Sequence, residues 1–270
     1  MIDNDPLQQF RLDGRVILIT GSTGYLGMPI AKAIAAVGGM PILAGRDKEK
    51  LLKLSDEIAT FGGKSMALAF DIGNPDECRA AIKEIAQKIS SLSGIVNCAY
   101  GGQPATMEAT SDNDFKIAMD QNLTGPFALI QASLPMLRLA AQLPGGASII
   151  NIASMYGHVS PDPRIYGNSG KNNPPYYGAS KAALLQLTRY LACHLGSENI
   201  RINSISPGAF PPQTIKETSP DFYAELCKKT PMGRIGSQTE LIGPSLFLLS
   251  AASSFVNGAD LVVDGGWTAW

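Results

Sequence analysis

The chain has 270 residues, of which 45% are hydrophobic and 17% charged, a composition typical of a globular protein with a sizeable core. The formal net charge of −1 provides no strong field to attract a polyanion, so we expect neither a nucleic-acid nor a membrane partner. The four cysteines are widely separated and form no C-x-x-C pair, which argues against a disulfide framework and against a metal site.

The ends of the chain show no targeting or membrane signal. The first ten residues, MIDNDPLQQF, are acidic and lack an apolar h-region, and the apolar stretch near the carboxyl end is broken by glycine, proline and asparagine. We therefore expect a cytoplasmic protein whose cysteines remain reduced and act as small packing residues.

Short apolar runs alternate with longer helical patterns along the whole chain. The runs predicted as buried strands are 15–20, 40–45, 65–70, 94–99, 147–153, 200–206 and 260–265. The predicted helices are 26–37, 48–61, 75–89, 112–141, 177–195 and 239–249. This order predicts an α/β fold, a Rossmann-type doubly wound sheet of seven parallel strands with helices on both faces.

No linker or repeat interrupts the pattern, so residues 1–270 are predicted to form a single nucleotide-binding domain. Two loops, 157–175 and 207–220, are unusually rich in proline and glycine. Because ligands of doubly wound folds bind beside the loops that follow strands, both loops are candidates for the active site.

A glycine-rich turn, ITGSTGYLG, joins the first strand to the first helix. Glycines at this spacing let the backbone approach a pyrophosphate at the helix amino terminus. A glycine triplet also suits an ordinary turn, but its position after the first strand favours a dinucleotide. The residues expected to bind the phosphates are Gly21, Ser22, Thr23, Gly24, Tyr25, Leu26 and Gly27.

The end of the second strand reads ILAGRDKEKL and indicates the cofactor. An acidic residue here would bind the ribose of NAD, whereas a cation would bind the 2′-phosphate of NADP. Gly45 occupies the acidic position, Arg46 follows, and Asp47 is expected to cap the next helix. We therefore favour NADP over NAD, although Arg46 could also be a solvated residue at the start of a helix.

The stretch PPYYGASK contains the candidate acid/base. Of the 8 tyrosines, only Tyr177 has a lysine four residues later, and in a helix Lys181 would share its face. A hydride moving to a carbonyl carbon leaves charge on the oxygen, which an acid must neutralise. We expect the charge of Lys181 to lower the pKa of Tyr177. Tyr176 points about 100° away and is expected to pack or to contact substrate.

Two further polar residues complete the proposed site. Ser154 follows the fifth strand and would hold the substrate oxygen, although a serine can also cap the exit from a strand. Asn122 is a poor helix former within a helical segment, which suggests a side chain that binds a water and breaks the ladder, or simply an exposed residue. His158 and His194 lack acidic partners at usable spacing and are expected to be structural.

Taken together, the fragments ITGSTGYLG, GIVNCAYGG, DQNLTGPF, SIINIASMYG, YYGASKAAL and IRINSISPGAF resemble the short-chain dehydrogenase/reductase family, single-domain branch. The resemblance covers nearly the whole chain and implies an oxidoreductase, a small-molecule substrate and a homo-oligomer, either dimer or tetramer. The cofactor contacts that it implies are Asp71, Ile72, Asn97, Ala99, Tyr177, Lys181, Pro207 and Gly208. The catalytic set that it implies is Asn122, Ser154, Tyr177 and Lys181.

Three features depart from the family pattern. The glycine spacing places Gly24 where the longer, sugar-nucleotide-modifying branch has its glycine, and Tyr25 where the single-domain branch has one. Cys98 and Tyr100 replace an asparagine and a glycine of the family's N-N-A-G motif. The threonine that often follows the P-G dipeptide is missing, and Thr214 is the nearest candidate.

The segment between Ser154 and Tyr177 exceeds the family's usual length by on the order of ten residues. Because an insertion there lies beside the active site, its side chains could bind a polar or anionic substrate, or instead form a subunit contact. The candidate substrate contacts are Tyr156, Arg164, Tyr166, Lys171 and Tyr176. The insertion is similar to that of family members from bacterial surface-sugar and flagellin-glycan pathways.

The expected activity is an NADP-dependent interconversion of a carbonyl and an alcohol, on a polar, sugar-like substrate. The alternatives are a 3-oxoacyl thioester reductase, a sugar dehydratase or epimerase suggested by the glycine spacing, and a catalytically silent NADP sensor or scaffold. The complete catalytic set argues against the sensor, which would need only the cofactor loop.

Overall fold

The protein is described by a computed structural model that covers residues 6–167, 169 and 172–270. Its strands form one sheet in the order β3-β2-β1-β4-β5-β6-β7, and each neighbouring pair is parallel. The strands are β1 (Val16–Thr20), β2 (Met40–Gly45), β3 (Met66–Ala69), β4 (Gly94–Asn97), β5 (Ala147–Ile152), β6 (Ile200–Pro207) and β7 (Asp260–Val263). The predicted seven-stranded Rossmann-type sheet is confirmed.

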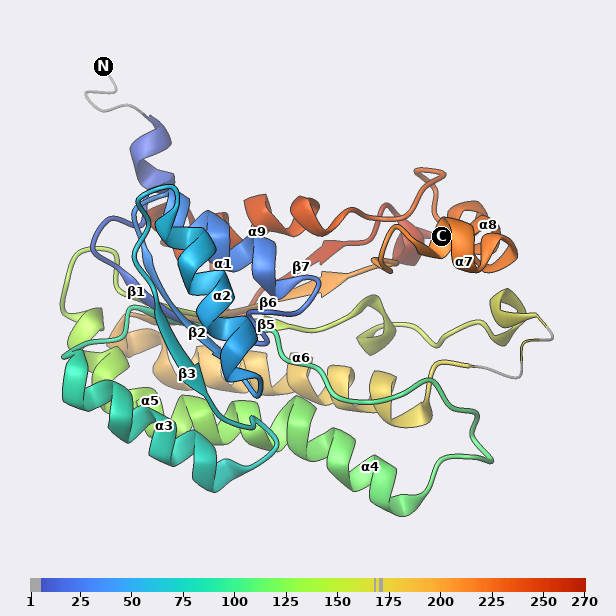
Figure 1. Ribbon diagram of the computed structural model, residues 1–270, viewed down its shortest axis with the longest axis horizontal. Helices are drawn as coiled ribbons and strands as arrows, with labels where there is room; N and C mark the ends of the chain where they lie inside the picture. Colours follow the sequence, from blue (N-terminus) through green and yellow to red (C-terminus); the bar gives the residue numbers. More distant parts are fainter. Residues whose placement is uncertain (1–5, 168, 170–171) are drawn as a thin grey trace.

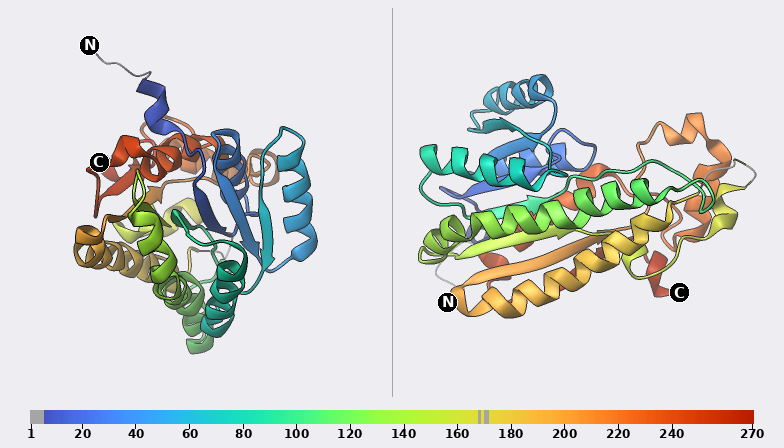
Figure 2. Two further views of the ribbon diagram at one scale, coloured as in Figure 1. Left: turned by 90° about the vertical axis from the view of Figure 1, so that its left-hand side faces the viewer. Right: turned by 90° about the horizontal axis from the view of Figure 1, so that it is seen from below.

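Helices cover both faces of the sheet (Figure 1, Figure 2). One face carries α1 (Gly27–Ala36), α2 (Lys48–Ala59) and α9 (Ile242–Leu249), and the other carries α3 (Pro75–Lys88), α5 (Gly125–Ala141) and α6 (Pro175–Leu195). The remaining helices are α4 (Asp112–Met119), before α5, and α7 (Ile215–Thr218) and α8 (Pro220–Lys229), after β6. Within the described residues, no helix is both long and apolar enough to span a bilayer.

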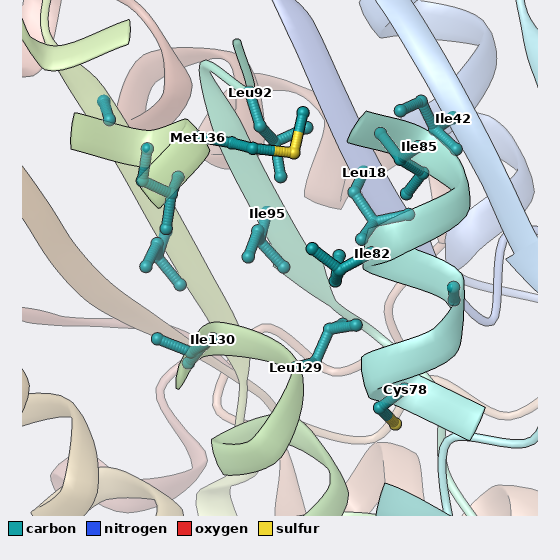
Figure 3. Close-up of a cluster of buried hydrophobic side chains, with 14 of the residues drawn as sticks. Leu18, Ile42, Cys78, Ile82, Ile85, Leu92, Ile95, Leu129, Ile130 and Met136 are labelled. Carbon is teal, nitrogen blue, oxygen red and sulfur yellow. The ribbon is translucent and has the colours of Figure 1, made fainter. Parts of the chain in front are cut away.

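The strands are apolar on both faces because both are covered by helices. In β1, Leu18 packs towards α3 and α5, whereas Ile17 and Ile19 pack towards α1, and all three are fully buried. Figure 3 shows how Leu18 and Ile95 meet Ile82 of α3 within the first of these clusters. Each buried side chain of this size stabilises the fold by about 1.5–3 kcal/mol. The core therefore holds the carboxyl ends of the strands in fixed positions.

The long helix predicted over 112–141 is interrupted. The chain changes from α4 to a π-helical turn, η2 (Asp120–Thr124), and then to α5. Asn122 lies in that turn and is buried, so the interpretation of Asn122 as an exposed helical residue is wrong. A π-turn inserts one residue into the helical ladder, and such turns occur frequently at functional sites.

The proline-rich segments contain more structure than the sequence indicated. Helix α8 was not predicted, although it has Pro220 at its first position, Asp221 in its first turn and two lysines in its last. The insertion contains a short 3-10 helix, η4 (Pro163–Tyr166). A small apolar cluster that includes Ile165 of η4 and Leu226 of α8 joins the two segments.

Candidate active site

A cavity of about 870 Å³ extends along the carboxyl ends of the strands, from the turn after β2 to Tyr177 in α6. Most of the candidate cofactor residues line it. They are Gly21, Thr23, Gly24, Tyr25, Leu26, Gly27, Arg46, Asp71, Ile72, Ala99, Tyr177 and Gly208. The sequence therefore located one continuous site, although the individual roles of these residues remain predictions.

The turn after β1 requires glycine at two positions. Gly21 has φ 65°, and a Cβ there would lie 2.8 Å from the Cα of Ala99. A Cβ on Gly27 would overlap the carbonyl oxygen of Gly21. Helix α1 begins at Gly27, and no side chain of the described residues caps its amino terminus. Bare backbone and an uncapped helix amino terminus fit the pyrophosphate of a dinucleotide.

Some candidate cofactor residues lie behind the cavity wall. Ser22 is fully buried and its hydroxyl donates to the carbonyl oxygen of Ala44 at 3.3 Å, so it shapes the turn. The amide nitrogen of Asn97 donates to Asn151 Oδ1 at 2.8 Å, beneath the end of β4. Neither residue lines the cavity, and neither does Pro207. The Asn97 side chain thus bonds across to β5, and the expectation that Asn97 runs under the cofactor stays a prediction.

The end of β2 supplies cations to the cavity. Arg46 is exposed and lines the cavity beside Lys50. Asp47 accepts a hydrogen bond from the backbone nitrogen of Lys50 at 3.1 Å and pairs with its ammonium group at 3.1 Å. Asp47 therefore caps α2, as predicted. Among the described residues, no carboxylate forms an ion pair with Arg46, so its guanidinium group is available to an anionic ligand.

Tyr177 and Ser154 meet at the other end of the cavity. Their hydroxyl groups form a hydrogen bond, which lowers the pKa of Tyr177, but burial has the larger effect and raises that pKa. The prediction of a lowered pKa is therefore wrong for the protein alone, because removing the phenol from water disfavours the phenolate. The Ser154 oxygen also accepts a hydrogen bond from the backbone nitrogen of Tyr156 at 3.1 Å.

Lys181 lies one helical turn beyond Tyr177 and is buried. Its ammonium nitrogen is 5.9 Å from the centre of the Tyr177 ring and donates to the carbonyl oxygen of Ile152 at 2.7 Å. Burial lowers the pKa of Lys181 to about 8. At neutral pH most molecules therefore carry a fixed positive charge next to the tyrosine.

Asn122 links the π-turn to its neighbours. Its amide nitrogen donates to Ser180 Oγ at 3.2 Å and to the carbonyl oxygen of Gly101 at 3.4 Å, and its oxygen accepts from the Gly101 nitrogen at 3.4 Å. The oxygen can accept a second hydrogen bond, so the expectation that the side chain binds a water stays a prediction. The helical ladder is interrupted at this residue by the π-helical turn.

The five candidate substrate contacts separate into three groups. Tyr156 and Tyr166 line the cavity. Arg164 does not, because its guanidinium group pairs with Asp162 at 2.8 Å in a separate surface hollow. Tyr176 is 3% exposed and also lies outside the wall; its hydroxyl donates to the Gln103 carbonyl at 2.8 Å, which favours the packing alternative. Lys171 lies outside the described residues.

Several residues of the wall were missed by sequence reasoning. They are Tyr100, Gln121, Asn173, Phe210, Phe222 and Leu226. Tyr100 gave a signal, since it stands where the family has glycine. Its ring meets that of Tyr177 edge-on, with 5.1 Å between the centroids. Phe222 and Leu226 lie in α8; the proline and charge signals of that helix could have placed them on a helix, but not in the cavity wall.

The expectation that His158 lacks an acidic partner is also wrong. His158 Nε2 lies 2.7 Å from Asp260 Oδ2, and Ser206 Oγ donates to Asp260 Oδ1 at 3.0 Å. The partners are far apart in sequence, so spacing could not reveal the pair. It joins the segment after Ser154 to β7.

Comparisons with known proteins agree with this geometry. A family model described as enoyl-(acyl carrier protein) reductase matches residues 24–268. The chain is 32% identical over 268 residues to the 7α-hydroxysteroid dehydrogenase of Escherichia coli (strain K12), with 98% of both chains covered.

Solved structures are similar over the same length. One is a short-chain type dehydrogenase/reductase from Mycobacterium marinum, with 33% identity, a TM-score of 0.86 and coverage of 99% of this chain and 100% of that one. Another is a gluconate 5-dehydrogenase from Burkholderia cenocepacia in complex with NADP and tartrate, with 32% identity, a TM-score of 0.87 and coverage of 98% and 100%. The chain therefore belongs to the short-chain dehydrogenase/reductase family, the NAD(P)-dependent oxidoreductases of alcohols and carbonyls.

Proposed function

We propose that the protein reduces a ketone to a secondary alcohol, and catalyses the reverse oxidation, with NADP(H) in preference to NAD(H). The observation that carries the proposal is the meeting of the Tyr177 and Ser154 hydroxyls in one cavity with the cation Arg46. A similar gluconate 5-dehydrogenase was solved with NADP, which supports the cofactor. Because the similar proteins act on substrates as different as a hydroxysteroid and gluconate, the substrate class must be judged from the cavity itself.

The chain's own side chains would provide the proton chemistry. NADPH, when bound, supplies the hydride that the carbonyl carbon accepts. Because burial raises the pKa of Tyr177, its hydroxyl is protonated at neutral pH and can donate its proton to the substrate oxygen. Ser154 would donate a hydrogen bond to that oxygen, and the charge of Lys181 would stabilise the phenolate that remains.

Replacing each of the adjacent tyrosines tests the assignment. Tyr177→Phe should lower kcat for ketone reduction by at least about a hundredfold, because the proton donor is lost, while the Kd for NADPH changes little. Tyr176→Phe is the matched control, since among the described residues its hydroxyl bonds only to the backbone of Gln103. It should retain most of kcat and lower the melting temperature.

The opposite result, with Tyr176→Phe inactive and Tyr177→Phe active, would contradict the assignment. Tight binding of NADPH without turnover of any ketone would instead favour the silent sensor. The two functions are thus distinguished by one pair of variants and two measurements, NADPH affinity and NADPH oxidation.

We also propose that the protein works in the cytoplasm as a homo-oligomer. All four cysteines are free thiols, which suits a reducing compartment. Helix α5 exposes Phe127 by 41% and Leu139 by 50%, and such apolar side chains are commonly covered in oligomers. Light scattering on the purified protein should give the mass of a dimer or tetramer; the mass of one chain would refute this proposal.

A further inference from the structure

The wall of the cavity around Tyr177 is aromatic. The rings of Tyr100 and Tyr156 both face that of Tyr177 edge-on, at centroid distances of 5.1 Å and 6.4 Å and interplanar angles of 86° and 84°. Beyond them, the rings of Tyr166 and Phe222 lie 5.2 Å apart, tilted by 30°. Flat side chains on several sides leave a space suited to a flat, apolar molecule.

Two tyrosine hydroxyls of this wall have partners, whereas Asn173 Oδ1, in the same wall, is buried without a hydrogen-bond partner among the described residues. The hydroxyl of Tyr156 is hydrogen-bonded to that of Tyr166, which in turn bonds to Asn173. Burial raises the pKa of both tyrosines, so their hydroxyls remain neutral. One hydroxyl group of a substrate could donate to Asn173 Oδ1, but the further hydroxyl groups of a polyol would be buried against aromatic rings, and each unsatisfied group disfavours binding.

The charged side chains of the wall lie at its other end. Among the described residues, those lining the cavity are Arg46, Asp47, Lys50 and Asp71, which follow β2 and β3. Lys181 is buried behind Tyr177 and donates to the backbone of Ile152. A carboxylate bound beside Tyr177 would therefore lose its hydration, and none of the described wall residues near it would supply a positive charge in return.

From these observations we infer that the substrate is a neutral ketone or secondary alcohol carried on an alicyclic or aromatic ring, bound between Tyr100, Tyr156 and Phe222. This inference rests on the proposed function and names its substrate class, which differs from the sugar derivative expected from the sequence. In the reducing direction the carbonyl carbon gains a hydride from NADPH and its oxygen gains the Tyr177 proton, so that alcohol and NADP⁺ are formed. Solvent then returns a proton to the tyrosine.

Two segments distant in sequence set the width of this space. Tyr166 belongs to the insertion and Phe222 to α8, and an ion pair between Asp162 and Lys229 holds the segments together. The ring of Phe222 packs on that of Tyr166, whereas the rings that face Tyr177 are those of Tyr100 and Tyr156, so replacing Phe222 alters the wall and leaves these ring contacts of the proton donor in place. Phe222 is therefore the residue to test.

The experiment compares three ketones as substrates for NADPH oxidation by the full chain. 2-Decalone is neutral and bicyclic, 2-decanone is neutral and linear with the same number of carbons, and 5-keto-D-gluconate is anionic and polyhydroxylated. We expect kcat/KM for 2-decalone to exceed that of both others by about tenfold or more. Phe222→Ala should raise KM for 2-decalone by about threefold to tenfold and leave kcat nearly unchanged, as the loss of one aromatic contact predicts.

The matched control is Tyr190→Ala, an aromatic residue of α6 that is 60% exposed and stacked on His194, outside the cavity wall. It should leave KM unchanged. A preference for 5-keto-D-gluconate, equal turnover of the two ten-carbon ketones, or an unchanged KM in a folded Phe222→Ala protein would each overturn the inference while leaving the proposed function intact.

Binding is measured in parallel, by the thermal shift that each ketone causes in the protein saturated with NADP⁺. If NADPH binds but no ketone is reduced, the proposed function fails. The inference about the cavity is then still decided, because a larger shift with 2-decalone than with 5-keto-D-gluconate supports it and the reverse order refutes it.

Discussion

The cofactor preference can be reversed at the end of β2, where Gly45 precedes Arg46. A Cβ on Gly45 would have as its nearest neighbours Leu51 Cδ2 and Thr23 Oγ1, both at 3.8 Å, which is ordinary van der Waals contact. An aspartate therefore fits without strain. It would place a carboxylate where NAD-binding proteins hold the ribose hydroxyl groups, and it would repel the 2′-phosphate of NADPH. Arg46→Ala removes the cation that we expect to bind that phosphate.

The size of each effect follows from exposure and distance. A hydrogen bond to a charged group contributes about 1.5–3 kcal/mol, and the exposure of Arg46 places it near the lower end. Arg46→Ala should thus weaken NADPH binding by about tenfold. Two like unit charges about 4 Å apart repel by about 1 kcal/mol in water and by about 4 kcal/mol near a protein surface. Gly45→Asp should therefore weaken NADPH binding by at least a further factor of about five. The double variant should prefer NADH.

Affinities can be measured by titrating each protein with NADPH and NADH and following the cofactor fluorescence. A suitable control is Lys64→Ala. This exposed lysine precedes β3 and so lies at the amino-terminal ends of the strands, whereas Arg46 lies at their carboxyl ends. It should change neither Kd. Equal affinities in the wild type, or an Arg46→Ala variant that weakens NADH as much as NADPH, would show that Arg46 does not read the 2′-phosphate.

Four further predictions concern Lys181, the cysteines and the pair formed by His158 and Asp260. Because the pKa of Lys181 is about 8, kcat/KM for ketone reduction should fall as pH rises through that value; a profile flat to pH 10 would contradict this role. Lys181 binds its proton less tightly in the folded chain than in the unfolded chain. Its contribution to the free energy of unfolding should therefore rise from pH 8 to 10, which denaturation at several pH values would show. Iodoacetamide should modify exposed Cys193 before Cys98, because burial raises the pKa of Cys98 to about 11. Peptide mass spectrometry that finds Cys98 labelled first would refute this order. His158→Ala breaks the pair with Asp260 and should lower the melting temperature by roughly 2–4 °C in calorimetry, whereas an unchanged value would mean that the pair contributes nothing.

The sequence by itself determined the sheet, the glycine-rich turn after β1 and which of the two adjacent tyrosines lies beside Lys181. These features depend on local patterns. Continuous apolar runs are required where a parallel sheet is covered on both faces, as β1 and β5 show. Glycines are required where backbone approaches backbone, as at Gly27. The four-residue step to Lys181 places Tyr177, and not Tyr176, beside the lysine.

Only the tertiary structure decided the shape and chemistry of the substrate space. Arg164 looked like an anion-binding residue in sequence, but its neighbour Asp162 pairs with it and turns it out of the cavity. Phe222 had no recognisable role until the fold brought α8 over the insertion, against Tyr166. The pair formed by His158 and Asp260 joins positions that no spacing rule connects. Such contacts depend on how whole elements pack against one another, which is a sum over many side chains and is not contained in any short stretch of the sequence.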